Sequence, residues 1–184
     1  MIWLIVLLAV VLGVLLLLVL FYNRLVRLRN RVDNSWAQVE VQLKRRWDLI
    51  PNLVETVKGY AAHERETFEA VTQARANAQQ ARTPAETAQA EGILGAALGR
   101  LLAVAEAYPE LQADENFRQL QTELAETENR VAVSRQVYND AVLTFNNAIQ
   151  TFPGAVLAGP FGFIAREFFE VEEVAQREAP VVDF

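Results

Sequence analysis

An uncharged apolar run at the start of the chain constrains its fold more than any other feature. The 21 residues from Ile2 to Tyr22 carry no charged side chain and consist mostly of Leu, Val and Ile. As a helix they would extend roughly 31 Å, enough to cross a hydrocarbon core of about 30 Å. A cleaved signal peptide would instead have a basic leader, a shorter apolar stretch and a small-residue cleavage site. We therefore expect residues 1–22 to form a retained transmembrane anchor.

A basic collar directly after the apolar run predicts the orientation of the anchor. The collar consists of Arg24, Arg27, Arg29 and Arg31. Basic residues remain preferentially on the cytoplasmic side of a membrane, which would place the N-terminus outside and residues 23–184 in the cytoplasm. In that position we also expect the collar to contact anionic lipid.

Charge is divided unequally over the rest of the chain. Residues 23–58 carry a net charge of +4 and residues 59–184 a net charge of −10, which together account for the total of −6. A basic segment near the membrane and an acidic remainder fit a protein that stands on an anionic surface. Nucleic acid is disfavoured as a partner, because no basic surface extends over the larger part of the chain.

Long helices are predicted for the whole segment after the anchor. From Leu25 to Val54, apolar residues recur with an eleven-residue period, which gives about 3.67 residues per helical turn and nearly straight packing. Thr83, followed by Pro84 and with Glu86 at the third helical position, predicts a capped helix start. Asp114 is a plausible cap for a last helix that ends before Pro153.

The topology depends on Pro51. If the chain turns near Pro51, four helices of comparable length form an antiparallel up-and-down bundle over residues 23–151, and we favour this arrangement. If Pro51 only kinks the first helix, three helices result, over residues 24–82, 86–108 and 114–150. The eleven-residue period passes through Pro51 without a shift, which supports the second alternative.

The C-terminal segment, residues 152–184, has a different composition. It is rich in Phe and interrupted by Gly and Pro. Such a segment must cover an apolar surface, which could belong to its own bundle, a neighbouring subunit or the membrane. Together with a compact basic triplet, its aromatic residues form the candidate interaction surface: Lys44, Arg45, Arg46, Phe161, Phe163, Phe168 and Phe169.

Residue types suited to catalysis or metal binding are scarce. The chain has no Cys and one His, which excludes a disulfide framework, a thiolate nucleophile and a multi-histidine metal centre. His63 begins a sequence similar to a zincin motif, but Thr67 stands where the second His would be needed. We therefore expect no catalytic residues, no metal site and no cofactor.

Several motifs along the chain resemble the LemA family. The longest runs from Arg29 to Ala61 and reads RNRVDNSWAQVEVQLKRRWDLIPNLVETVKGYA. Shorter matching motifs are Tyr108-Pro109-Glu110-Leu111, Asn116-Phe117, Glu128-Asn129-Arg130, Tyr138-Asn139 and Phe152-Pro153-Gly154. The resemblance implies an N-terminal membrane anchor, an outward N-terminus and a cytoplasmic helical bundle. It supplies no reaction and no catalytic residues.

Three functional hypotheses follow from the sequence. The first is a non-enzymatic scaffold or adaptor at the cytoplasmic face of a bacterial inner membrane, which binds copies of itself or another protein. The second is a lipid-binding oligomer that shapes the membrane through the basic collar and the aromatic tail. The third, an enzyme, would need a site assembled from Asp, Glu, Arg and Tyr alone.

Overall fold

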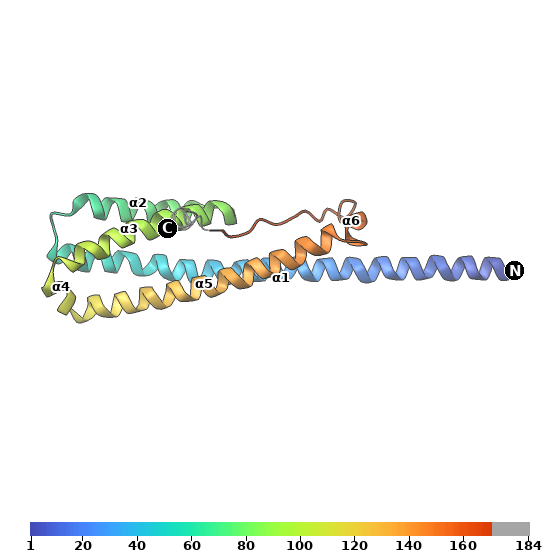
Figure 1. Cartoon of the computed structure of the whole chain (residues 1–184), viewed down its shortest axis with the longest axis horizontal. Coiled ribbons are helices and arrows are strands. Elements are labelled where there is room, and N and C mark those ends of the chain that lie inside the picture. Colours follow the sequence, from blue (N-terminus) through green and yellow to red (C-terminus); the bar gives the residue numbers. More distant parts are fainter. Residues whose placement is uncertain (171–184) are drawn as a thin grey trace, which may run out of the picture. The chain divides into compact units, whose positions relative to one another are not determined.

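The computed structural model describes residues 1–170, and the regular elements in that range are all helices (Figure 1). Four of them are long: α1 (Ile2–Tyr60), α2 (Arg65–Gln80), α3 (Pro84–Glu106) and α5 (Glu115–Gln150). Two are short: α4 (Pro109–Ala113) and α6 (Gly154–Leu157). The predicted all-α fold is confirmed. The predicted tail extends beyond Glu170, and residues 171–184 lie outside the described residues.

The predicted turn near Pro51 is wrong. Helix α1 continues through Pro51 and ends at Tyr60, and the chain turns over residues 61–64 instead. The single helix over residues 24–82, which was the alternative, is wrong for the same reason. Four long helical segments nevertheless follow the apolar run in the described part of the chain, because the turn lies about ten residues later than predicted.

A substitute hydrogen-bond donor for the carbonyl oxygen of Trp47 allows α1 to continue through Pro51. Proline has no backbone N–H, so the carbonyl four residues earlier, that of Trp47, loses its helical donor. Arg75 on α2 replaces this donor, because its Nε donates a hydrogen bond to the Trp47 oxygen at 2.7 Å. A side chain from the next helix thus satisfies the backbone group that the proline leaves unpaired.

The contacts within the chain define two compact units. The first contains Met1–Gln38 and Gln136–Glu167, and the second contains Val39–Arg135 and, of the described residues after Glu167, Phe168 to Glu170. The predicted boundaries at residues 22 and 151 separate an anchor, a bundle and a tail by their expected functions. The two units are defined by contacts, so they do not test these boundaries, which stay a prediction.

The second unit has an apolar core to which α1, α2, α3 and α5 all contribute. Buried members include Leu53, Val71, Leu98 and Leu124, one from each of these helices. Two of the helices, α3 and α5, begin at the predicted signals: Thr83 and Glu86 form a capping box at α3, and the backbone N–H of Phe117 in α5 donates to Asp114 Oδ1 at 2.9 Å. Of the eleven-residue pattern, Ile50 is a buried member of this core, and Trp47 and Val54 pack against it.

The first unit contains the apolar run. From Ile2 to Leu20 no side chain is buried, although this stretch is strongly apolar and long enough to cross a membrane. Helix α3, in the second unit, meets the same test of length and composition, but its Leu94 and Leu101 are core residues. The apolar run therefore lacks a covering surface in the described part of the chain, as expected for a membrane span.

Candidate functional site

A buried ion pair lies inside the second unit. The carboxylate of Glu91 on α3 accepts hydrogen bonds at both oxygens: from Arg46 Nη1 at 2.8 Å and from Trp47 Nε1 at 2.6 Å. Both Glu91 and Arg46 are buried, and Trp47 is half-buried. Two adjacent residues of α1 thus hold one carboxylate of α3.

Burial dominates the electrostatics of this pair. It raises the pKa of Glu91, because desolvation disfavours the charged carboxylate, while the charge of Arg46 and the hydrogen bond from Trp47 act in the opposite direction. Glu128 Oε1 lies 3.9 Å from Arg46 Nη2, but the Glu128 side chain is mostly exposed. Its attraction to Arg46 therefore contributes little to stability, because solvent screens it. Since both oxygens of Glu91 are occupied by protein donors, the pair fixes helices and offers no open position to a substrate.

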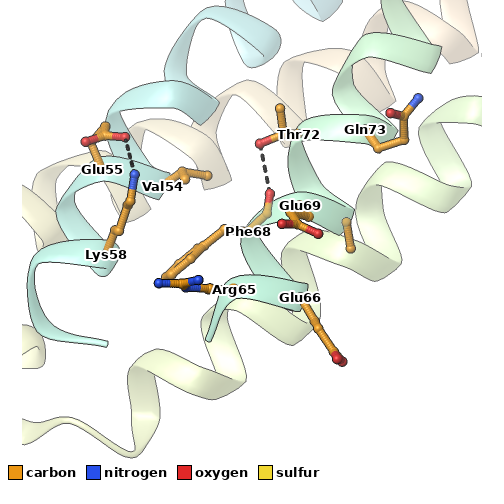
Figure 2. A pocket seen from close by; sticks show the side chains of 10 residues that line it. Val54, Glu55, Lys58, Arg65, Glu66, Phe68, Glu69, Thr72 and Gln73 are labelled. Carbon is orange, nitrogen blue, oxygen red and sulfur yellow. Dashed lines mark hydrogen bonds and ion pairs between the residues drawn. The ribbon is translucent and has the colours of Figure 1, made fainter. Parts of the chain in front are cut away.

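An open groove of about 1080 Å³ lies between α1 and α2 in the same unit (Figure 2). Val54 and Phe68 form its apolar part. Lys58 Nζ and Glu55 Oε1 lie 3.5 Å apart at its edge, and both side chains are largely exposed. The other charged groups, such as Arg65, are exposed as well. Exposed charges of both signs are typical of a solvated helix surface and do not form a catalytic arrangement.

Metal-binding groups do not gather anywhere in residues 1–170. No cluster of three or more His, Asp or Glu side chains that could hold a metal ion occurs there. His63 is exposed in the turn between α1 and α2.

In the first unit, an extended segment after α6 is held on α5. The side-chain amide of Asn146 pairs with the backbone of Arg166: Nδ2 donates to the carbonyl oxygen, and Oδ1 accepts from the N–H, both at 2.9 Å. The hydroxyl of Tyr138 donates to the carbonyl oxygen of Glu167 at 2.8 Å. Arg166 also forms an ion pair with Asp33 on α1, with Nη2 and Oδ1 2.7 Å apart.

An aromatic cluster fixes the same segment nearer to the apolar run. The ring of Phe163 is buried and lies 5.7 Å from the ring of Tyr22 and 6.4 Å from that of Phe145, measured between centroids. The guanidinium of Arg29 stands 5.5 Å from the centroid of Phe163, within the range of a cation–π contact. Phe161 also contacts Tyr22, at 5.1 Å.

The sequence profile of the LemA family matches residues 35–184, most of the chain, including the ion pair and the segment that Asn146 holds. The chain belongs to the LemA family.

Similar proteins include magnetosome proteins and a protein named LemA. The magnetosome protein MamQ 1 of Paramagnetospirillum magneticum is 27% identical over 191 aligned positions, which cover 90% of this chain and 70% of that protein. MamQ of Magnetospirillum gryphiswaldense is 25% identical over the same shares. Protein LemA of Metamycoplasma hominis is 27% identical over 128 positions, which cover 67% of this chain and 57% of that protein.

The basic collar of this LemA family member has mixed surroundings. Arg24, Arg27 and Arg31 are exposed, and Arg29 is half-buried. Arg24 stands 5.6 Å from the ring centroid of Phe21. Contact of the basic collar with lipid stays a prediction.

The candidate interaction surface needs correction at three positions. Arg46 is buried in the ion pair with Glu91, so only Lys44 and Arg45 of the basic triplet are exposed. Phe163 and Phe169 are buried within their own chain. The remaining residues are still available: Phe161 is exposed and Phe168 is half-buried.

Sequence reasoning missed Glu91, Arg75 and Asn146. A signal existed for Glu91, which lies four residues after Thr87 and three before Leu94, on the face of α3 that is buried. A carboxylate on an apolar helix face requires a partner. No comparable local signal exists for Arg75 or Asn146, because both act on backbone groups that are distant in the sequence.

Proposed function

We propose that this member of the LemA family is a single-pass, membrane-anchored helical scaffold or adaptor without catalytic activity, which assembles with copies of itself. One observation carries the proposal: a single helix, α1, contains both the uncovered apolar run and core residues of the second unit, such as Leu53. An anchor that continues into a packed helix ties the domain to the membrane without an intervening linker. The side chains of Arg46 and Glu91 bind each other and hold α1 against α3, which supports a structural role for this buried pair.

Crosslinking of the full-length protein in its own membrane tests this proposal. A lysine-reactive crosslinker, applied to membranes before solubilisation, should produce species heavier than the monomer that contain further copies of the chain or another protein. A variant with Lys44→Arg and Lys58→Arg, which keeps both charges, controls for reactivity at these exposed positions. Monomers alone, with no second protein, would contradict the proposal.

The location forms part of the proposal. We place the protein in the inner membrane of a bacterium, with the N-terminus outside and the domain after Tyr22 in the cytoplasm, because the basic collar follows the apolar run. Since the chain has no Cys, an introduced cysteine is its sole thiol. The variant Arg45→Cys should react with a membrane-impermeant maleimide only after the cells are opened, and reaction in intact cells would contradict the orientation.

A membrane-shaping oligomer is the second candidate function. The exposed apolar side chains of Phe152 and Val156 support it, because they could enter the membrane surface. Electron microscopy of vesicles that contain the full-length protein tests it. Curvature that increases with the amount of protein would support this function, and vesicles of unchanged shape would contradict it.

A further inference from the structure

An exposed apolar loop follows α5. Between Asp140 and Arg166 the sequence contains no charged side chain. In the part of this stretch that follows α5, residues 151–165, four large apolar side chains are exposed to a considerable degree: Phe152 (85%), Val156 (64%), Phe161 (51%) and Ile164 (75%). Single exposed apolar residues are common, but four in one short uncharged segment indicate a surface that another apolar medium covers.

The loop lies beside the end of the apolar run. Phe161 and Phe163 both contact the ring of Tyr22, with centroids 5.1 and 5.7 Å apart, and Tyr22 is the last residue of the apolar run. Tyrosine at the end of a span belongs to the level of the lipid headgroups. With the proposed anchoring through residues 2–22, the exposed side chain of Phe161, which contacts Tyr22, would lie at the boundary of the bilayer.

Several contacts fix the conformation in which the loop presents these side chains. A Cβ atom on Gly154 would collide with the carbonyl oxygen of Ala148, so the chain passes α5 too closely for any other residue. At the far end of the loop, Asn146 holds both backbone groups of Arg166, and Phe163 is buried. The apolar side chains thus project from a constrained turn.

We propose that residues 152–164 form a second membrane contact, which inserts Phe152, Val156 and Ile164 into the lipid leaflet that contains Tyr22. A lipid surface is favoured over a second copy of the chain because the loop adjoins the predicted span, and because Arg24 and Arg29, whose guanidinium groups stand over the rings of Phe21 and Phe163, follow that span directly, where they would meet anionic headgroups. This inference rests on the proposed anchoring through residues 2–22. It adds a contact that would restrict rotation and tilt of the anchor.

Spin-label accessibility in the full-length protein tests the proposal. Val156→Cys and Val41→Cys form a matched pair, since Val41 in the second unit is exposed to 63%. Each variant carries a nitroxide at its only thiol and is placed in vesicles of phosphatidylglycerol and phosphatidylethanolamine. Oxygen concentrates in lipid, whereas a nickel chelate stays in water. The ratio of oxygen to nickel accessibility should be several-fold higher at position 156 than at position 41.

A second pair of labelled variants controls for any structural change that the label causes at one position. Ile164→Cys should behave like Val156→Cys, and Ile93→Cys on α3, where the side chain is exposed to 54%, should behave like Val41→Cys. Equal ratios at all four positions would overturn the proposal. Low accessibility to both reagents at positions 156 and 164 would also overturn it, because it indicates contact with another protein surface.

A label within the span separates this inference from the anchoring on which it depends. Leu12→Cys should show the high oxygen ratio of a lipid-exposed site. If position 12 is in lipid and position 156 is in water, the loop contact is wrong and the anchor is right. If position 12 is itself in water, the anchoring is wrong.

Discussion

The second unit buries a charged pair, whereas the first unit exposes apolar side chains. In the second unit, Arg46 and Glu91 are removed from water and hold α1 against α3. In the first unit, the polar side chains of Asn146 and Tyr138 hold backbone groups, and apolar side chains such as Phe152 remain exposed. The exposed apolar side chains of the second unit, such as Val41 and Ile93, are scattered, whereas those of the first unit form a long continuous run and one uncharged loop, as expected for a surface that an apolar medium covers.

Removal of one member of the buried pair should have the largest effect. The variant Glu91→Leu leaves the guanidinium of Arg46 buried without its partner, and we expect a loss of about 4 kcal/mol in the free energy of unfolding. Thermal unfolding of the full-length protein, followed by circular dichroism, measures this loss. The exposed Glu126→Leu is the control.

A double variant sharpens the same test. Arg46→Met combined with Glu91→Leu replaces both charges by apolar groups, and most of the lost stability should return. If the double variant is as unstable as Glu91→Leu, the loss arises from packing and the ion pair is not its cause.

A methyl group at Gly154 should disturb the first unit. Gly154→Ala places a Cβ against the backbone of Ala148, and such overpacking costs about 2 kcal/mol. Gly159→Ala is the matched control, because a Cβ there meets no atom within 4 Å. Limited proteolysis after Thr151 should be faster in Gly154→Ala alone. Equal rates in the two variants would show that the close passage past Ala148 does not occur.

Removal of the Asn146 side-chain amide, which binds the extended segment, should have a smaller and local effect. Asn146→Ala removes two hydrogen bonds from the backbone of Arg166, each worth about 1 kcal/mol. Amide exchange at Arg166 and its neighbours should become at least roughly tenfold faster, since 1.4 kcal/mol corresponds to a factor of ten. The exposed Asn147→Ala should leave exchange unchanged, and an equal effect of both variants would contradict the contact.

The smallest effect concerns pH. Burial raises the pKa of Tyr138 from its ordinary value of 10.0 to about 12. Because the folded pKa lies above the unfolded value, the stability that this group contributes is present below pH 10 and is lost as the pH rises toward 12. Tyrosinate absorption should therefore show one late titration that Tyr138→Phe lacks. An unchanged late titration in that variant would contradict the assignment.

Helix starts and buried positions could be predicted from the sequence where they depend on neighbouring residues alone. Thr83 and Asp114 mark the starts of α3 and α5, and the eleven-residue period identifies buried positions such as Val39 and Ile50. Local signals failed at Pro51, because a donor from another helix, Arg75, satisfies the carbonyl that the proline leaves unpaired.

The candidate sites were harder to predict for the same reason. Arg46 belongs to a basic triplet that resembles a solvated surface, and only its pairing with Glu91, far away in the sequence, makes it a buried residue. The tail could be recognised as apolar from its composition. Which of its rings are buried depends on contacts with Tyr22 and Phe145, which composition does not contain.

The number of copies in one membrane assembly tests the proposed scaffold most directly. The full-length variant Glu126→Cys, labelled with one fluorophore per chain and diluted into supported bilayers, allows stepwise photobleaching of single spots. We predict several bleaching steps in most spots, with unchanged step numbers when Glu126→Cys is replaced by Ile93→Cys, since both positions are exposed and lie outside the candidate interaction surface. Single steps in nearly all spots, at protein densities that match the native membrane, would contradict it.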